Sequence, residues 1–240
     1  MDPLSSARRT ATLGLRGALL IAGLVVAADQ VLKVWVKLTM LYDTAFPLIP
    51  GWDKAYIHFI ENRGMAFGLE FGGEWGKLAL TLFRIAAVFG IGWYLRSITR
   101  EGAPRLLVIS VALVLAGALG NIIDSTFYGL LFSRSTFTER AVFLPAEGGY
   151  APLFHGAVVD MFYFPLYDDR LPEWVPIWGG RHVTFFRPVF NIADAAITVG
   201  IALYILMQRG GRRKEQASAE EGSEAATPTA EADPATDPVS

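Results

Sequence analysis

The sequence contains no cysteine and three histidines. Without cysteine the chain can form no disulfide bond, no thiolate metal site and no cysteine nucleophile. The histidines, His58, His155 and His182, are too far apart in the sequence to form a metal-ligand motif. We therefore expect neither a metal ion nor a cofactor.

Charged residues are also scarce, at 18% of the chain, whereas hydrophobic residues make up 52%. This composition is too apolar for an ordinary soluble domain and is typical of a small membrane protein with several spans. The basic residues are placed as signals of membrane topology, so we expect no nucleic-acid binding.

Four stretches are apolar enough to cross a bilayer, which takes roughly 20 residues in a helix. They cover approximately residues 13–36, 78–95, 106–124 and 188–207. The first is preceded by Arg8, Arg9 and Arg16, as the apolar part of a cleaved signal peptide would be. Because Asp29 and Gln30 stand where a small-residue cleavage site is needed, we predict an uncleaved helix instead.

The basic residues also predict the orientation of these helices, because Lys and Arg near helix ends stay on the cytoplasmic side. Besides the three arginines before the first helix, basic residues lie between the second and third helices, at Arg96, Arg100 and Arg105. Others follow the fourth helix, at Arg209, Arg212, Arg213 and Lys214. Both termini are therefore expected in the cytoplasm. Residues 37–77 and 125–187 are expected on the outer side.

The outer segments complete the predicted fold. Residues 55–60 favour a short strand, and a turn is expected at Asn62, Arg63 and Gly64. We predict a membrane protein of four transmembrane α-helices with a small extracytoplasmic β-sheet at the membrane surface, in one domain of residues 1–207. The tail, residues 215–240, is rich in Ala, Glu, Pro and Thr and is expected to be disordered.

Polar residues interrupt two of the predicted helices near their outer ends. Asn121 and Asp124 are three residues apart, and Asn191 and Asp194 repeat that spacing. A carboxylate at membrane depth costs a few kcal/mol, so such residues usually face a protein interior or a functional site. Helix capping and interhelical hydrogen bonds are equally consistent with the spacing. The third stretch also carries small residues every four positions, at Ala112, Ala116 and Gly120, which permits close helix packing.

A further carboxylate, Asp160, lies in the apolar segment HGAVVDMFYF, just before the fourth helix. Two carboxylates in a partly dry site do not both ionise, so one retains a proton while the other activates water. Such a pair hydrolyses a bond without a metal. A small transporter or proton channel and a Ser–Lys peptidase remain as alternatives, although the acids map to the outer helix ends and no serine stands in a comparable motif.

Five segments, in this order, resemble motifs of the lipoprotein signal peptidase (signal peptidase II) family, which are bacterial four-helix membrane aspartyl proteases. They are DQVLK from Asp29, ENRGMAFGL from Glu61, GALGNIID from Gly117, GAVVDMF from Gly156 and FNIADAAITVG from Phe190. The resemblance covers about residues 20–207. It implies that Asp160 and Asp194 are the catalytic pair.

The resemblance also implies supporting residues. Asn121, Asp124 and Asn191 match positions that support the pair. The outer-loop residues Asn62, Gly64, Ala66 and Phe67 match a segment that contacts or covers the substrate. Asp29 and Lys33 match first-helix positions, where either an ordinary i,i+4 ion pair or a substrate contact is consistent with the spacing.

The implied reaction removes the signal peptide from a prolipoprotein, by cleavage on the N-terminal side of a cysteine that carries a diacylglyceryl group. The implied partners are this lipidated prolipoprotein and membrane lipid. We expect a monomer in the bacterial cytoplasmic (inner) membrane, with its active site near the outer leaflet. The sequence does not decide which aspartate holds the proton.

Two features depart from the family pattern. Ser125 stands where the family commonly has arginine after the acidic residue, and residues 125–157 form an unusually long outer insert. The insert is interpreted as a lid or as a surface excursion without a role. Arg84, inside the second helix, is expected to replace the missing cation by pairing with Asp124 or a catalytic aspartate, or else to face a polar crevice or lipid headgroups.

Overall fold

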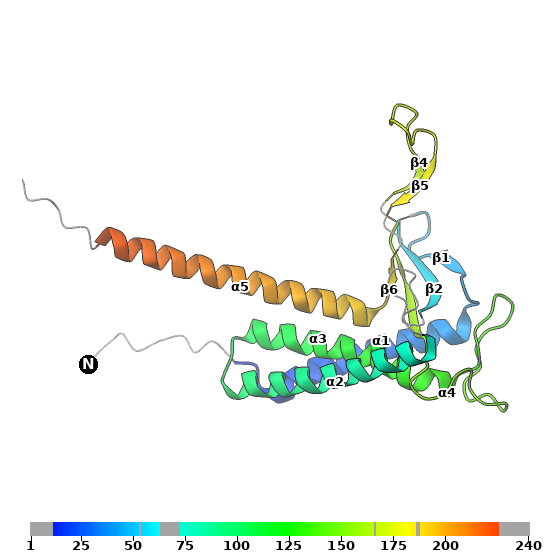
Figure 1. The fold of residues 1–240 in the computed structure, drawn as a ribbon, viewed down its shortest axis with the longest axis horizontal. Coiled ribbons are helices and arrows are strands. Elements are labelled where there is room, and N and C mark those ends of the chain that lie inside the picture. Colours follow the sequence, from blue (N-terminus) through cyan, green and yellow to red (C-terminus); the bar gives the residue numbers. More distant parts are fainter. Residues whose placement is uncertain (1–11, 53, 63–72, 166, 186–187, 226–240) are drawn as a thin grey trace, which may run out of the picture.

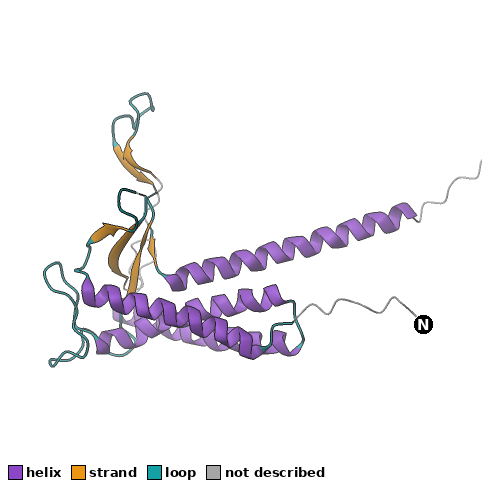
Figure 2. Ribbon diagram, turned by 180° about the vertical axis from the view of Figure 1, so that it is seen from behind, coloured by secondary structure: helices purple, strands orange, loops and turns teal. Residues whose placement is uncertain are grey.

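Four long helices and a small antiparallel sheet make up the computed structural model of the chain, which describes residues 12–52, 54–62, 73–165, 167–185 and 188–225. In this part of the chain, four helices are long and apolar enough to cross a membrane. They are α1 (Leu15–Thr39), α2 (Gly73–Arg100), α3 (Arg105–Ile123) and α5 (Ile192–Ala225). The sheet lies at one end of the helices (Figure 1), and Figure 2 shows the same arrangement from behind. The predicted fold class is confirmed.

Helix α3 packs against α1, α2 and α5, and its contact with α5 is the most extensive. A Cβ atom at Gly117 of α3 would lie 2.1 Å from the carbonyl oxygen of Ala193 in α5. Further along, Ser110 Oγ donates a hydrogen bond of 2.7 Å to the carbonyl oxygen of Gly200. The predicted small residues Ala112, Ala116 and Gly120 are buried. Small residues therefore set the distance between the two helices, as in other membrane proteins.

Beyond Ile123 the chain widens into a π-helical turn, Asp124–Tyr128, followed by the short helix α4 (Gly129–Leu131). The carbonyl oxygens of Ser125 and Thr126 leave the helical ladder. They accept hydrogen bonds from the backbone N–H groups of Gly156 (2.9 Å) and Phe154 (3.2 Å). Turns of this kind often occur at functional sites. Here the turn joins the end of α3 to the segment that leads to Asp160.

The main sheet has the strand order β1-β2-β3-β6, with every neighbouring pair antiparallel. Its strands are β1 (Ala45–Pro47), β2 (Tyr56–Asn62), β3 (Val158–Tyr163) and β6 (Val189–Phe190). Strand β2 agrees with the predicted strand. A separate two-stranded sheet pairs β4 (Tyr167–Arg170) with β5 (His182–Phe185).

The fourth predicted helix differs from the structure at both ends. Residues 189–190 are a strand, because Val189 and Phe190 pair with Tyr163 and Phe162 along the open edge of β3. Pro188 is therefore not part of the helix, which begins after Asn191. At its other end α5 continues to Ala225, so residues 215–225 are helical where disorder was expected. Ala, Glu and Gln in this part are strong helix formers. Residues 226–240 lie outside the described residues.

The insert at residues 125–157 is packed into the outer core. Tyr128, Phe132 and Ala141 are buried in one cluster with Val36 of α1 and Phe59 of β2. A polar cluster reinforces this packing through Lys37, Glu61 and Ser135. Lys37 forms an ion pair with Glu61 and donates a 3.1 Å hydrogen bond to Ser135 Oγ, which donates in turn to Glu61 at 2.9 Å. The insert is thus tied to α1 and β2 by buried contacts.

Candidate active site

The structure brings Asp160 and Asp194 together from two different elements. Asp160 lies in β3 and is 5% exposed, and Asp194 lies in the first turn of α5 and is half-buried. Asn191 Nδ2 donates a 2.7 Å hydrogen bond to Asp160 Oδ1, and Asn121 Nδ2 donates one of 2.7 Å to Asp194 Oδ1. The two amides touch each other, with Asn191 Nδ2 3.2 Å from Asn121 Oδ1. Both aspartates therefore belong to one hydrogen-bonded unit.

The orientation of each asparagine side-chain amide is set by a group that can only donate a hydrogen bond. Asn191 is the N-cap of α5, because its Oδ1 accepts the backbone N–H of Asp194 at 2.8 Å. Its NH₂ group is thereby turned toward Asp160. Lys33 Nζ donates to Asn121 Oδ1 at 3.0 Å, which turns the NH₂ group of Asn121 toward Asp194. For Asn191, helix capping and a hydrogen bond to the Asp160 carboxylate are both present.

Lys33 is fully buried and joins two carboxylates to this unit. Its Nζ lies 2.8 Å from Asp29 Oδ2 and 2.9 Å from Asp124 Oδ2. The i,i+4 ion pair considered for Asp29 and Lys33 is therefore present, and it is buried and extended by Asp124. The other oxygen of Asp29 accepts the backbone N–H of Ala193 at 2.9 Å. This bond holds the beginning of α5 against α1, one residue before Asp194.

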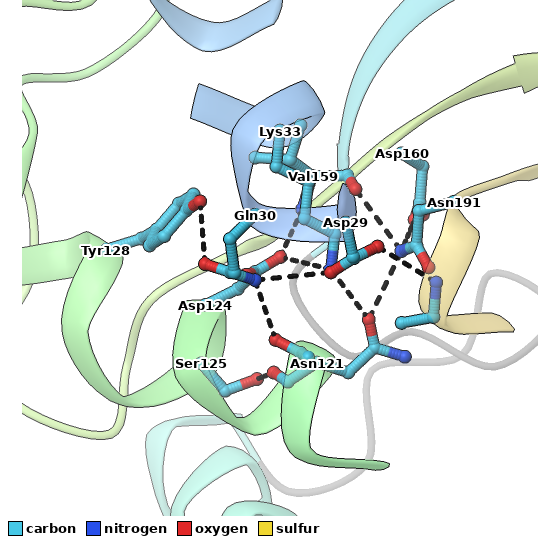
Figure 3. Close-up of polar contacts among 12 residues, drawn as sticks. Asp29, Gln30, Lys33, Asn121, Asp124, Ser125, Tyr128, Val159, Asp160 and Asn191 are labelled. Atoms are coloured by element: carbon cyan, nitrogen blue, oxygen red, sulfur yellow. Dashed lines mark hydrogen bonds and ion pairs between the residues drawn. The ribbon is translucent and has the colours of Figure 1, made fainter. Parts of the chain in front are cut away.

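Asp124 connects the end of α3 to the strand that carries Asp160. Its Oδ2 accepts the backbone N–H of Val159 at 3.1 Å, and its Oδ1 accepts Gln30 Nε2 at 2.9 Å. Tyr128 completes the connection, since its hydroxyl donates to Gln30 Oε1 at 3.1 Å. Figure 3 shows these residues converging from α1, α3, the π-helical turn and β3.

Gln30 and Tyr128 belong to this network although the sequence did not single them out. Gln30 stands beside Asp29 in the first motif, and Tyr128 lies four residues after Asp124, one helical turn along. Their closeness in sequence to Asp29 and Asp124 was the one signal that could have indicated a role in the site. Their contacts could not be predicted, because each joins segments that are far apart in the chain.

Arg84 forms no ion pair with Asp124, one of the partners considered for it; Lys33 does. Lys33 of α1 provides the cation for Asp124. The guanidinium of Arg84 instead lies beside Ser125, with Nη1 3.5 Å from Oγ. Its charge interacts electrostatically with Asp194 and, less strongly, with Asp160. Arg84 thus lies beside Ser125 and interacts with both Asp194 and Asp160.

Of the four predicted outer-loop residues, the structure describes Asn62. Asn62 is the last residue of β2, whose Ile60 lies opposite Asp160 in the sheet. Gly64, Ala66 and Phe67 lie outside the described residues. The described residues also contain no group of three or more His, Asp or Glu side chains that could hold a metal ion.

Burial is the main reason why the pKa of Asp160 lies above its ordinary value. It raises the pKa of this carboxyl, and the negative charge of Asp194 raises it further. The charge of Lys33 and the hydrogen bond from Asn191 act in the opposite direction, and the resulting pKa is about 8. Burial and the Asp194 charge therefore favour the protonated form of the Asp160 carboxyl.

Comparison with known proteins agrees with this geometry. Residues 21–208 match the model of a protein family described as Signal peptidase (SPase) II. The chain belongs to this family. It is thus a multi-pass membrane peptidase of a bacterial family, which decides against the channel.

Two relatives and one solved structure illustrate the similarity. The chain is 46% identical over 184 residues to a lipoprotein signal peptidase of Porphyromonas gingivalis, covering 76% of this chain and 78% of that protein. It is 40% identical over 192 residues to a lipoprotein signal peptidase of Amoebophilus asiaticus, covering 79% and 76%. The fold is similar to that of a bacterial membrane enzyme solved by the in meso method at 1.9 Å resolution. That match has a TM-score of 0.54 and 24% identity, covering 83% of this chain and 96% of that one.

Proposed function

We propose that this chain is an aspartyl endopeptidase that removes the signal peptide from diacylglyceryl-modified prolipoproteins, N-terminal to the lipidated cysteine. The observation that supports it most directly is the pair Asp160 and Asp194, held by the touching amides of Asn191 and Asn121. The family and the relatives named lipoprotein signal peptidase support the substrate.

The two aspartates have different roles in this proposal. Asp160, buried and protonated at neutral pH, donates its proton to the scissile carbonyl oxygen. Asp194, whose negative charge contributes to the raised pKa of Asp160, accepts a proton from the attacking water. The tetrahedral intermediate then collapses. Asp194 gives its proton to the leaving nitrogen and Asp160 recovers one from the intermediate. The products are a peptide carboxylic acid, which loses its proton to water on release, and the amine of the lipidated cysteine.

The placement of the pair fits a substrate that is anchored in the membrane. Asp160 and Asp194 lie at the end of the bundle where the sheet is found, opposite to the start of α1 and the end of α5 (Figure 1). With both termini in the cytoplasm, as the basic residues predict, this end is at the outer leaflet. A diacylglyceryl group would then hold the scissile bond at the depth of the pair. We propose that the chain acts as a monomer.

The test is cleavage of a diacylglyceryl-modified prolipoprotein by the purified full chain in detergent, next to the same substrate without lipid. Asp160→Asn and Asp194→Asn should each abolish cleavage, whereas Glu147→Gln, at an exposed carboxylate of the insert, should not. Normal turnover by either aspartate variant would refute the assignment. Equal cleavage of the unlipidated substrate would refute the proposed specificity.

We also propose that Arg84 stabilises the negative charge of the reacting groups in place of the arginine replaced by Ser125. Its support is the proximity to Ser125 and the electrostatic interaction with both aspartates. Arg84→Gln should lower kcat by about a hundredfold, as loss of an electrostatic group in a transition state does. Adding Ser125→Arg to this variant should restore much of the rate. If the folded double variant with Arg84→Gln and Ser125→Arg is no more active than Arg84→Gln alone, Arg84 does not replace an arginine at position 125.

The outer-loop residues are assigned a role in substrate binding. We propose that Asn62, Gly64, Ala66 and Phe67 contact or cover the lipidated peptide. The position of Asn62 at the end of β2, two residues beyond the partner of Asp160, supports this role.

A further inference from the structure

The hairpin of β4 and β5 ends in a group of exposed apolar side chains that the proposed reaction does not use. Residues 171–181 connect the two strands. Within this tip, Trp174 is 80% exposed, Ile177 89% and Trp178 58%. A monomeric soluble surface rarely gathers such large apolar groups without a partner.

The tip is an ordered structure. The backbone N–H of Leu171 donates to Arg181 (2.9 Å), and the N–H of Gly180 donates back to Leu171 (2.9 Å). The N–H of Gly179 donates to Val175 at 3.0 Å. Ile177 has a φ angle of +71°, a conformation that is rare for a β-branched residue. The backbone thus keeps an unfavourable conformation while the apolar side chain of Ile177 remains outside.

The position of the hairpin indicates what covers the tip. In both views it projects sideways from the sheet, at the end of the bundle and across the direction of the helices (Figures 1 and 2). Helices that span a bilayer stand roughly along its normal, so the hairpin extends along the membrane plane at the level of the helix ends. That level is the membrane–water interface, where tryptophan is enriched. The exposed tryptophans of the tip therefore lie at the depth where tryptophan is enriched in membrane proteins.

We propose that Trp174, Ile177 and Trp178 insert into the outer interface of the lipid bilayer. The ligand is the phospholipid layer between headgroups and acyl chains. The hairpin follows β3, which carries Asp160, and precedes β6 and the start of α5, which carries Asp194. Insertion of its tip fixes the height of both catalytic elements relative to the lipid. This proposal is independent of the reaction assigned to the site.

The absence of cysteine makes a direct depth measurement possible. A nitroxide label at Ile177→Cys in the full chain, reconstituted in phosphatidylethanolamine/phosphatidylglycerol vesicles, is compared with labels at two exposed positions. Thr138→Cys on the insert reports water, and Leu24→Cys on α1 reports lipid. The label at 177 should be shielded from a water-soluble nickel complex at least about fivefold relative to the label at 138, and should be accessible to oxygen. Equal nickel access at 177 and 138 would overturn the proposal.

A second comparison tests the tryptophans themselves. Trp174→Ser with Trp178→Ser should raise the nickel access of the label at 177 at least about threefold in vesicles. The matched changes Phe137→Ser with Val142→Ser, at exposed apolar residues of the insert, should leave it unchanged. If a protein and not lipid covers the tip, the label at 177 stays open to nickel in vesicles that hold this chain alone, which refutes the assignment.

Discussion

Replacement of Asp160 by asparagine is expected to stabilise the protein while it removes activity. The carboxyl of Asp160 is buried, and its pKa is raised from an ordinary value of 3.8 to about 8. Asparagine has nearly the same shape, retains an oxygen that accepts the hydrogen bond from Asn191, and carries no titratable proton. The variant therefore removes the cost of a buried acid without opening a cavity.

The sign of the effect follows from proton binding. Between about pH 4 and pH 8 the folded protein keeps the proton of Asp160 while the unfolded chain releases it. The free energy of unfolding therefore falls by about 1.4 kcal/mol per pH unit in this window. Below the window the contribution of Asp160 to stability is fully present, and above about pH 8 it has been lost. At pH 8.5 the variant should be more stable by up to about 5 kcal/mol, or roughly 10–20 °C in Tm for a chain of this size.

The assay is thermal unfolding in detergent, followed by circular dichroism from pH 5 to pH 9, of wild type, Asp160→Asn and Glu147→Gln. The difference in Tm between Asp160→Asn and wild type should be small at pH 5, widen to pH 8 and then stay constant. Glu147→Gln should follow wild type throughout, since that residue is exposed. A Tm difference that does not change with pH would show that Asp160 is not the buried acid described here.

Three further predictions concern the site and its framework. The value of kcat/KM should fall above about pH 8, when the pair loses its shared proton, and a profile that is flat to pH 9.5 would contradict this. Lys33→Met should lower the free energy of unfolding by about 3–5 kcal/mol in denaturant titration, because Asp29 and Asp124 lose their buried cation. Adding Asp124→Asn should recover part of that loss. Gly117→Ala should separate α3 from α5 and reduce cleavage, because the new Cβ would meet the carbonyl of Ala193, next to Asp194. Gly90→Ala, where a Cβ meets nothing within 4 Å, should retain full activity and gain up to about 1 kcal/mol of stability.

The sequence alone predicted the features of this protein that are determined by residues close together in the chain. A transmembrane helix needs about 20 apolar residues in a row, so all four spans were found, with ends up to seven residues from the observed ones. The repeated Asn–x–x–Asp spacing and the isolated Asp160 marked the polar residues that the structure now brings together. These signals are local, because the membrane makes each interruption of an apolar stretch costly wherever it occurs.

Tertiary structure decided which partner each polar group has. The pairing of Lys33 with Asp124 joins segments that are far apart in the chain, so no spacing could assign Lys33 instead of Arg84 to that carboxylate. The strand at Val189–Phe190 exists because β3 offers an open edge, although the residues were compatible with a helix. Which aspartate holds the proton was likewise undecidable from the sequence. Burial and the charge of a neighbouring carboxylate set the pKa of Asp160, and both are properties of the folded chain.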